Sequence, residues 1–298
     1  MRDRQVGVLV HLSLDNWELS VLDTSYDIAA DRLIADGFLI ITVLPLVQKR
    51  LSGVFEAAHH FFREPNEAKE RTRFPKDMGY RPFGGEYSNS PLNPDQVESF
   101  TVSPDAIAPN RITSDTGRIL CQGMLSCYES FESIAEGLTI NLANKLSQAE
   151  AGNSLRGEFH RWSRLQLNYS RPKEVKTTFI NESHEDGALL TIAHAREPGL
   201  ELQISDETFV PITNSPNEVL VIPGDIAWLL SGGRLRPMFH RVRPESNCAE
   251  RIALLFFADL NPRLCEPWVR NEINQDVDIG ALVLKNPKRF GLDEWKLE

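Results

Sequence analysis

The chain has 298 residues, 41% hydrophobic and 25% charged, which is ordinary for a globular protein with a sizeable core. Its formal net charge of -10, from 42 acidic and 32 basic residues, argues against nucleic acid or an anionic membrane as the main partner. We therefore expect one domain spanning residues 1–298 that binds a small molecule. The sequence does not indicate an oligomeric state.

The amino terminus and the cysteines bear on the cellular compartment. Residues 1–10 have only a short apolar run before His11, unlike a secretory signal peptide. No stretch approaches the roughly 20 apolar residues that a membrane span requires. The four cysteines form no C-x-x-C pair, so free thiols and a cytoplasmic location are predicted.

The first 160 residues are predicted to be mostly helical, with a few early strands. Apolar residues recur at helical spacing over 18–36, 46–62 and 114–149. Ser114 or Thr116 can cap the last of these helices, and a short helix can begin at Pro65. The β-rich run 38–44 predicts a strand between the first two helices. This half is interpreted as a helical scaffold.

Residues 76–96 contain clustered glycines and prolines, which predicts a long loop. The loop carries Tyr80, Phe83 and Tyr87. Aromatic residues on a long ordered loop often mark a binding surface, so Tyr80 and Phe83 are candidate substrate contacts. The alternative is that they cover the outer rim of a barrel. Arg81, and Arg234 or Arg236, are possible anion contacts, but each is interpreted as a solvated surface charge.

From about residue 161 the pattern changes to short apolar runs separated by turn sequences such as Pro223-Gly-Asp225. Many short strands separated by such turns are typical of a sandwich or a barrel. We predict a mainly β fold, with a jelly-roll core over 161–262 and a tail, 263–298, that wraps it. The predicted strands cover residues 188–193, 200–204, 218–222, 226–230 and 252–257.

A candidate metal site follows from two histidines and an aspartate. His184 and Asp186 alternate, and side chains at i and i+2 of a strand share a face, so both can reach one ion. His240, from another strand, would complete the set. Two imidazoles and one carboxylate on one face, with the other positions open, is the ligand set of non-haem iron(II) oxygenases. A lone H-x-D pair means little, but His240 and Arg251 strengthen the pattern.

Arg251 begins an apolar run that ends at Phe257 and is predicted to be a strand. An inward guanidinium is a natural bidentate partner for a carboxylate. Phe257 has the same parity as Arg251 and would add an aromatic surface to the site. The remaining histidines are interpreted as structural or surface residues: His11, His59, His60, His160 and His194.

From about residue 8 to 262 the chain resembles the isopenicillin-N-synthase-like branch of the iron(II)/2-oxoglutarate oxygenases. The match consists of short motifs in the expected order. They are Gly37-Phe38, Phe61-Phe62 followed by Pro65 and Lys69, Gly79-Tyr80, Glu98-x-Phe100, Asn168-Tyr169, the H-x-D pair, Gly224-Asp225, Gly232-Gly-Arg234 and His240-Arg-Val242. The resemblance implies a double-stranded β-helix as the core.

The resemblance also implies a role for each site residue. His184, Asp186 and His240 would ligate iron(II), Arg251 would pair with the remote carboxylate of 2-oxoglutarate, and Tyr169 would donate to the same carboxylate. With O2, such a centre forms a ferryl species that hydroxylates, desaturates, cyclises or epoxidises its substrate. Because Asp186 is present, the halogenating relatives, which lack this carboxylate, are a poor match.

The substrate is predicted from strand parity around Tyr169. Leu165 and Leu167 would share the inward side of Tyr169, which gives an apolar wall with no charge for a substrate carboxylate. Together with Phe257, this wall favours a mid-sized, partly apolar metabolite, as in specialised-metabolite biosynthesis.

One departure from the family leaves alternatives open. The family has Arg-x-Ser where this chain has Arg251-Ile-Ala253, so one hydrogen bond to an anion, worth roughly 1.5–3 kcal/mol, is missing. One alternative is a 2-oxoglutarate-independent iron oxidase of the same fold whose substrate ligates iron directly. A further alternative is a non-catalytic jelly-roll binding protein, against which the intact triad stands.

Overall fold

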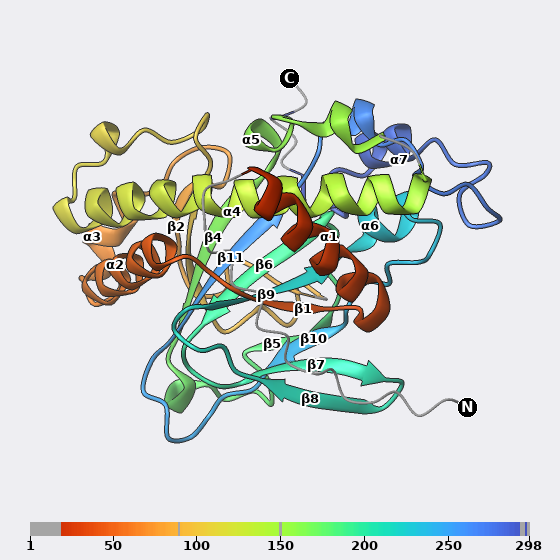
Figure 1. The fold of residues 1–298 in the computed structure, drawn as a ribbon. Helices are drawn as coiled ribbons and strands as arrows, with labels where there is room; N and C mark the ends of the chain where they lie inside the picture. The colour runs from red at the N-terminus through yellow and green to blue at the C-terminus, as the bar shows by residue number, and fades with distance from the viewer. Residues whose placement is uncertain (1–18, 89, 149–150, 293–295, 297–298) are drawn as a thin grey trace.

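A computed structural model describes residues 19–88, 90–148, 151–292 and 296. Two antiparallel sheets face each other, and helices cover the outer face of the larger sheet (Figure 1). The seven-stranded major sheet has the order β1 (Leu39–Thr42), β9 (Glu218–Pro223), β6 (Leu190–Ala195), β11 (Arg251–Ala258), β4 (Arg164–Ser170), β3 (Glu98–Val102), β2 (Gly79–Arg81). The four-stranded minor sheet has the order β5 (Asn181–His184), β10 (His240–Val242), β7 (Leu200–Ser205), β8 (Thr208–Ile212).

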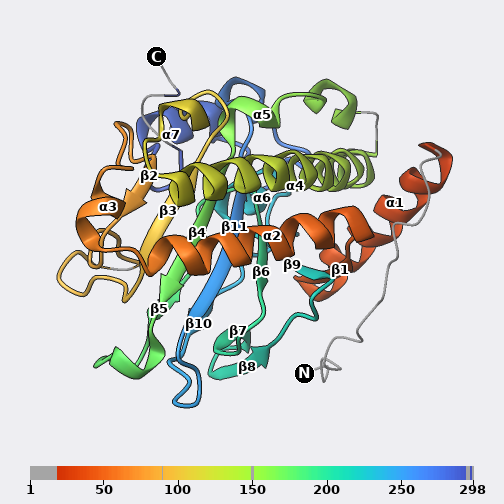
Figure 2. The same cartoon turned by 90° about the vertical axis from the view of Figure 1, so that its left-hand side faces the viewer.

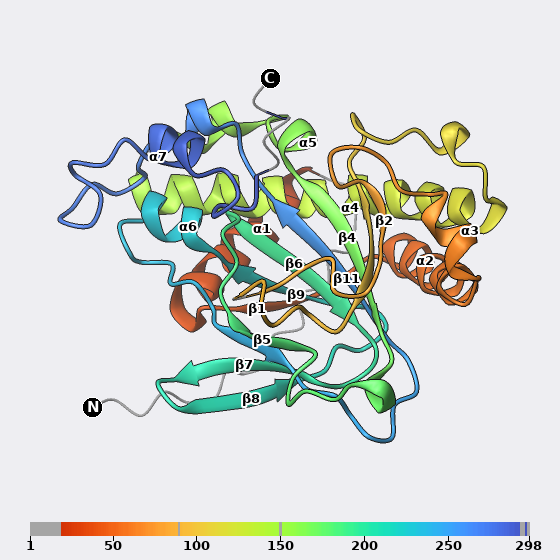
Figure 3. The same cartoon turned by 180° about the vertical axis from the view of Figure 1, so that it is seen from behind.

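The helices lie mainly in the amino-terminal half and pack on one side of the major sheet, with α2 and α4 next to each other across it (Figure 2). Seen from the other side, the major sheet is open toward the minor sheet (Figure 3). The helices are α1 (Leu19–Asp36), α2 (Pro45–Phe62), α3 (Asn66–Glu70), α4 (Asp115–Ser147), α5 (Phe159–Trp162), α6 (Asp225–Leu230) and α7 (Ile279–Lys285).

The long helix α4 is the centre of the helical layer. Ser114 caps it by accepting a hydrogen bond from the Gly117 backbone N–H, at 3.1 Å. Gly137 lets α1 approach closely, because a Cβ there would lie 2.5 Å from the Tyr26 ring. These local features fix where the helical layer meets the sheet.

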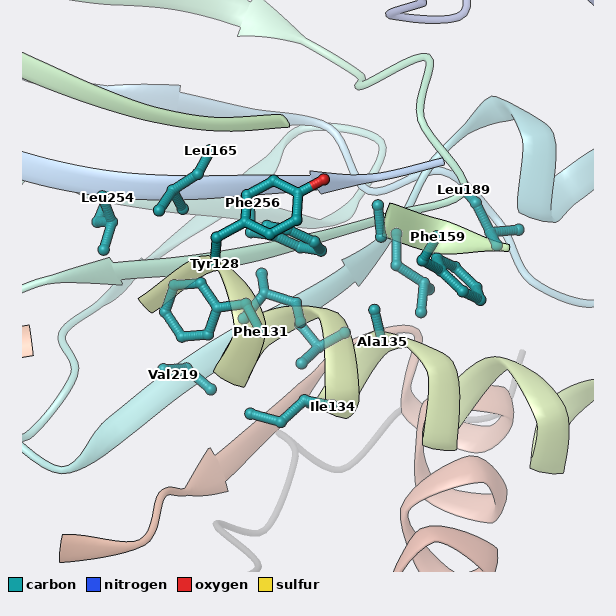
Figure 4. Close-up of a cluster of buried hydrophobic side chains, with 14 of the residues drawn as sticks. Tyr128, Phe131, Ile134, Ala135, Phe159, Leu165, Leu189, Val219, Leu254 and Phe256 are labelled. Carbon is teal, nitrogen blue, oxygen red and sulfur yellow. The ribbon is translucent and has the colours of Figure 1, made fainter. Parts of the chain in front are cut away.

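A dry core fills the space between α4 and the major sheet. The Phe256 ring of β11 meets Tyr128 and Phe131 of α4, with ring centroids 5.1 and 6.0 Å apart. Leu165 of β4 points into the same cluster (Figure 4). The Tyr128 hydroxyl donates to the Ser163 carbonyl at 3.0 Å, so its polar end is satisfied inside the core.

A second, smaller apolar cluster lies between the two sheets. Its members come from the facing strands and nearby segments: Val97, Ile180, Ala193, Leu200, Leu202, Leu220, Ile222 and Val242. The major sheet is therefore covered on both faces, by helices on one and by the minor sheet on the other. The candidate site lies on the second face.

The predicted fold class is confirmed: antiparallel sheets form a jelly-roll core flanked by helices. The helices predicted at 46–62 and 114–149 correspond to α2 and α4, and the strand predicted at 38–44 contains β1. Residues 1–18, including His11 and the start of the family resemblance, lie outside the described residues. Within the described part of the chain, no helix is long and apolar enough to cross a membrane.

One predicted strand is wrong, because residues 226–230 belong to helix α6. Gly224, just before the helix, packs so tightly that a Cβ would lie 2.2 Å from the Ala188 carbonyl oxygen. The chain leaves the sheet at this contact, and Ile226, Leu229 and Leu230 are buried at helical spacing. Short apolar runs fit both periods, which is why the prediction failed.

Candidate active site

The minor sheet brings the two histidines of the predicted triad together. His184 ends β5 and His240 begins β10, and the two are direct partners across the strands. Their ring centroids are 4.3 Å apart. Asp186 follows β5, with its oxygens 3.9 Å from each of the two Nε2 atoms. One donor atom from each residue lies within 4.8 Å of the other two, so all three can reach one ion.

Backbone carbonyls orient both imidazoles. The Nδ1 of His184 lies 2.7 Å from the Glu182 carbonyl, and the Nδ1 of His240 lies 3.0 Å from the Met238 carbonyl. A carbonyl accepts only from N–H, so both rings carry their proton on Nδ1 and turn the Nε2 lone pair toward Asp186. Such secondary hydrogen bonds are typical of metal-ligating histidines.

The charge states of the triad also suit a metal. Burial alone would raise the pKa of Asp186, but His240, His184 and a 2.6 Å hydrogen bond from the Thr191 hydroxyl lower it overall. Burial, together with His184, lowers the pKa of His240. An anionic carboxylate and a neutral imidazole are the forms that bind metal. The donor set therefore fits a divalent iron ion.

A cavity of about 680 Å³ lies over the triad, between the two sheets. Its wall on the major sheet consists mainly of side chains at alternate positions, as strand geometry predicts, with His194 of β6 as an exception. They are Arg251, Ala253, Leu255 and Phe257 of β11, Arg164, Gln166 and Asn168 of β4, Thr191, Ala193 and Ala195 of β6, and Leu220 and Ile222 of β9.

Arg251 lies at one end of this cavity and is only 5% exposed. Its Nε donates to the Pro198 carbonyl at 3.1 Å, which fixes the side chain. Burial lowers the pKa of Arg251 to about 10, against the opposing effect of Glu197, so the group stays charged at neutral pH. A buried guanidinium is costly unless an anion pairs with it. The position of Arg251 suits its predicted role, which stays a prediction.

The prediction that Tyr169 faces the cavity is wrong. Tyr169 points to the helical side of the sheet, where its ring stacks on Phe62 with centroids 4.7 Å apart. Its hydroxyl donates to Glu250 at 2.8 Å. Leu165 and Leu167 share this side and are fully buried, so the predicted apolar wall of the cavity is also wrong. The alternate residues of β4 were assigned to the wrong faces of the sheet.

The predictions for the loop residues Tyr80, Phe83 and Arg81 are also wrong. Tyr80 is buried away from the cavity, and its hydroxyl donates to Glu98 at 2.6 Å. Phe83 is 42% exposed and is not among the described residues that line the cavity. Arg81 does line the cavity, and its Nη1 donates to Glu86 at 3.1 Å, so it is not a solvated surface charge.

Sequence reasoning missed the polar row that replaces the apolar wall. Glu86 accepts from the Gln166 amide nitrogen at 2.7 Å, and the same nitrogen donates to Asn168 Oδ1 at 2.8 Å. Arg164 continues the row and lies over the Phe257 ring, 4.7 Å from its centroid. The sequence does not show which residues of β11 lie opposite β4. In antiparallel pairs, opposite residues share a face, and Ala253 lies opposite Asn168.

Comparisons with known proteins agree with this geometry. Residues 162–259 match the family model of the 2OG-Fe(II) oxygenase superfamily. A gibberellin 2-beta-dioxygenase of Phaseolus coccineus is 25% identical over 236 residues, 72% of this chain and 67% of that protein. Jasmonate-induced oxygenase 4 of Arabidopsis thaliana is 31% identical over 176 residues, 57% of this chain and 45% of that protein. Other curated relatives are matched over as little as 18% of their length.

Solved structures share the fold. A 2OG-Fe(II) oxygenase family protein from Caulobacter crescentus has a TM-score of 0.71 at 20% identity, covering 91% of this chain and 97% of that one. The rice dioxygenase for auxin oxidation has a TM-score of 0.67 at 21% identity, covering 95% and 96%. Residues 162–259, which include the triad, therefore form a 2OG-Fe(II) oxygenase domain. The protein is a non-haem dioxygenase whose cofactor is iron(II) and whose co-substrates are 2-oxoglutarate and O2.

Proposed function

We propose that His184, Asp186 and His240 hold the iron(II) and that Arg251 binds the remote carboxylate of 2-oxoglutarate. The observation that carries this proposal is the placement of the triad and a buried arginine in one cavity. When bound, the iron and the oxo acid supply the activation of O2 and the oxidising power. The protein supplies binding, orientation and exclusion of water.

The walls near Arg251 support this role. Leu200, Leu220 and Val242 line the cavity and belong to the apolar cluster between the sheets. In such surroundings an ion pair between a guanidinium and a carboxylate is stronger than it is in water. The fork of the guanidinium also fixes the direction of the bound carboxylate.

Asn168 can compensate for the hydroxyl that Ala253 lacks. The two residues lie opposite each other on β4 and β11 and both line the cavity. Because Asn168 Oδ1 accepts from Gln166, the amide nitrogen is the group that Asn168 can turn toward an anion. This arrangement supports binding of 2-oxoglutarate despite the departure from Arg-x-Ser.

We also propose that the substrate is a small-molecule metabolite, oxidised in a cytoplasmic specialised-metabolite pathway by hydroxylation, desaturation or ring closure. Relatives named for gibberellin and auxin oxidation support a small molecule. The four free cysteines are compatible with a reducing compartment. The polar row on β4 favours a substrate with hydrogen-bonding groups over the partly apolar one predicted from sequence.

The rival function is a 2-oxoglutarate-independent oxidase, which the missing hydroxyl at Ala253 favours. Protein reconstituted with iron(II) would be supplied with O2, 2-oxoglutarate and a metabolite panel, and succinate would be measured. We expect succinate to form in the wild type and not in His240→Ala. Substrate oxidation without succinate would support the rival. Iron binding that is as strong in His240→Ala as in wild type would contradict the assigned triad.

A further inference from the structure

The strand register places Arg164 at the height of the metal triad. Arg164 lies opposite Phe257, and Phe257 lies opposite Thr191 on its other side. Thr191 in turn holds Asp186 through its hydroxyl. Neighbouring strands are 4.7–4.9 Å apart, so the backbones of Arg164 and Thr191 are separated by about 10 Å. The long Arg164 side chain can therefore act close to the triad.

The Arg164 guanidinium is held in place by its surroundings. It lies over the Phe257 ring at 4.7 Å, and its Nη1 donates to the Gly291 carbonyl. The Gly291 N–H donates to the Lys288 carbonyl at 3.2 Å, so Lys288 belongs to the same turn and also lines the cavity. We call Arg164, Phe257, Lys288 and Gly291 the Arg164 subsite.

The Arg164 subsite is distinct from the Arg251 end of the cavity. Arg251 and Phe257 are six residues apart on β11, which corresponds to about 20 Å along a strand. Strand side chains stand roughly perpendicular to the sheet, so one five-carbon oxo acid cannot fill both ends of this distance. If Arg251 takes the oxo acid, Arg164 faces a different ligand.

The loop side of the cavity carries both signs of charge, because Lys76 and Arg81 lie among its acidic residues. Asp77 and Glu86 lie within ion-pair distance of Arg81, at 3.6 and 3.1 Å. Asp95, 8% exposed, accepts hydrogen bonds from Ser88. The residues that define the Arg164 subsite include two cations and no acid, so this subsite suits a substrate carboxylate better than the loop side does.

We propose that the primary substrate carries a carboxylate and that Arg164, assisted by Lys288, binds it. This inference rests on the proposed function, because it takes Arg251 as the site of the oxo acid. A planar guanidinium that is fixed over a ring binds a carboxylate through two parallel hydrogen bonds. The carboxylate anchored there leaves the rest of the molecule beside the triad.

The test uses a matched pair of probes, phenylacetate and phenylacetamide, which differ in charge and little in shape. Calorimetric titrations would be made on the anaerobic protein with iron(II) and 2-oxoglutarate, and again on the metal-free protein. We expect the acid to bind wild type about tenfold more tightly than the amide, as charge-assisted hydrogen bonds predict. Arg164→Gln should remove this preference, and Arg164→Lys should keep part of it.

The matched control is Arg196→Gln. The Arg196 guanidinium also lies over a phenylalanine, 5.1 Å from the Phe55 ring, but it is not among the described residues of the cavity wall. This variant should leave the preference for the acid unchanged. An acid preference that survives in Arg164→Gln, or no preference in wild type, would overturn the proposal.

A second readout separates this proposal from the assignment of Arg251. Binding of 2-oxoglutarate to the iron(II) protein should be the same in Arg164→Gln and in wild type. If Arg164→Gln loses 2-oxoglutarate, Arg164 belongs to the co-substrate site and the inference is wrong. If wild type binds no 2-oxoglutarate but the metal-free protein still prefers the acid through Arg164, the proposed function fails and the subsite stands.

Discussion

The two faces of strand β4 have opposite tasks. Leu165, Leu167 and Tyr169 face the helices and are fully buried in a dry core. Arg164, Gln166 and Asn168 face the minor sheet and line the cavity. Because a strand alternates at every residue, stability and ligand recognition are encoded in interleaved positions of the same seven residues. The same separation holds on β11, where Phe256 packs on α4 and Phe257 lines the cavity.

Replacing the two neighbouring phenylalanines of β11 one at a time has the largest expected effect, and it tests whether the two faces of the strand differ in their contribution to stability. Phe256→Ala should lower the free energy of unfolding by about 3–5 kcal/mol, because it empties a buried site between β11 and α4. Phe257→Ala should cost about 1 kcal/mol, because the ring is half-buried at the cavity wall. Urea denaturation measures both, and equal losses would contradict the division of faces.

Removing the charge of Arg251 tests the cavity face of the major sheet. Arg251→Met should weaken 2-oxoglutarate binding by about 2–3 kcal/mol, roughly 30-fold to 150-fold, because a buried carboxylate would lose its partner. Iron(II) binding should not change, since Arg251 is not part of the triad. Titration of the iron(II) protein with 2-oxoglutarate measures the effect, and unchanged affinity would show that Arg251 has another role.

Glu250, which precedes Arg251 in the chain, forms its hydrogen bonds on the helical side of the major sheet. Glu250 accepts hydrogen bonds from Arg63, Tyr169 and His59. The hydrogen bond from Arg63, with help from Tyr169, lowers the pKa of Glu250 to about 2. A carboxyl whose pKa is depressed by folding stabilises the fold above its ordinary pKa of about 4.3, and this contribution disappears as the pH falls toward 2.

Glu250→Gln should therefore cost roughly 1 kcal/mol at pH 7, a modest value because the side chain is partly exposed and screened. The difference between wild type and variant should shrink between about pH 4.3 and 2. Thermal or urea unfolding across this range would measure it. A difference that stays constant down to pH 2 would show that the interactions of Glu250 do not depend on its charge.

The smallest expected effect concerns the missing hydroxyl. Ala253→Ser would restore a donor opposite Asn168 on the cavity wall. We expect 2-oxoglutarate to bind about threefold to tenfold more tightly, a gain of about 1 kcal/mol. This is less than a full charge-assisted hydrogen bond, because Asn168 already supplies part of the interaction. Weaker binding in Ala253→Ser would indicate that Asn168 already occupies the place of the hydroxyl.

The triad could be found from sequence because its geometry is local. The i and i+2 spacing of His184 and Asp186 is enough to predict a shared direction, and His240 follows from the iron ligand set. The jelly-roll core could be predicted from the short strands and turns after residue 161. Strand parity also placed Arg251 and Phe257 on one side, and both line the cavity.

The face of β4 could not be predicted from its pattern alone. Both faces of the major sheet are covered, so alternation shows only that one side is more apolar than the other. The apolar row of Leu165, Leu167 and Tyr169 belongs to the dry core between the major sheet and the helices. The partner strand was the missing information: Arg251 lies opposite Ser170, which puts Tyr169 on the other side.

The most direct test of the central claim is an anaerobic titration of the protein with iron(II) and then 2-oxoglutarate, followed by visible absorption. Chelation of the oxo acid to iron(II) gives a weak metal-to-ligand charge-transfer band in the visible range, a property of the cofactor chemistry. We predict that the band forms in wild type and is absent in Asp186→Ala. Iron binding without the band in wild type, or the same band in Asp186→Ala, would contradict the assignment of this cavity as an iron(II) and 2-oxoglutarate site.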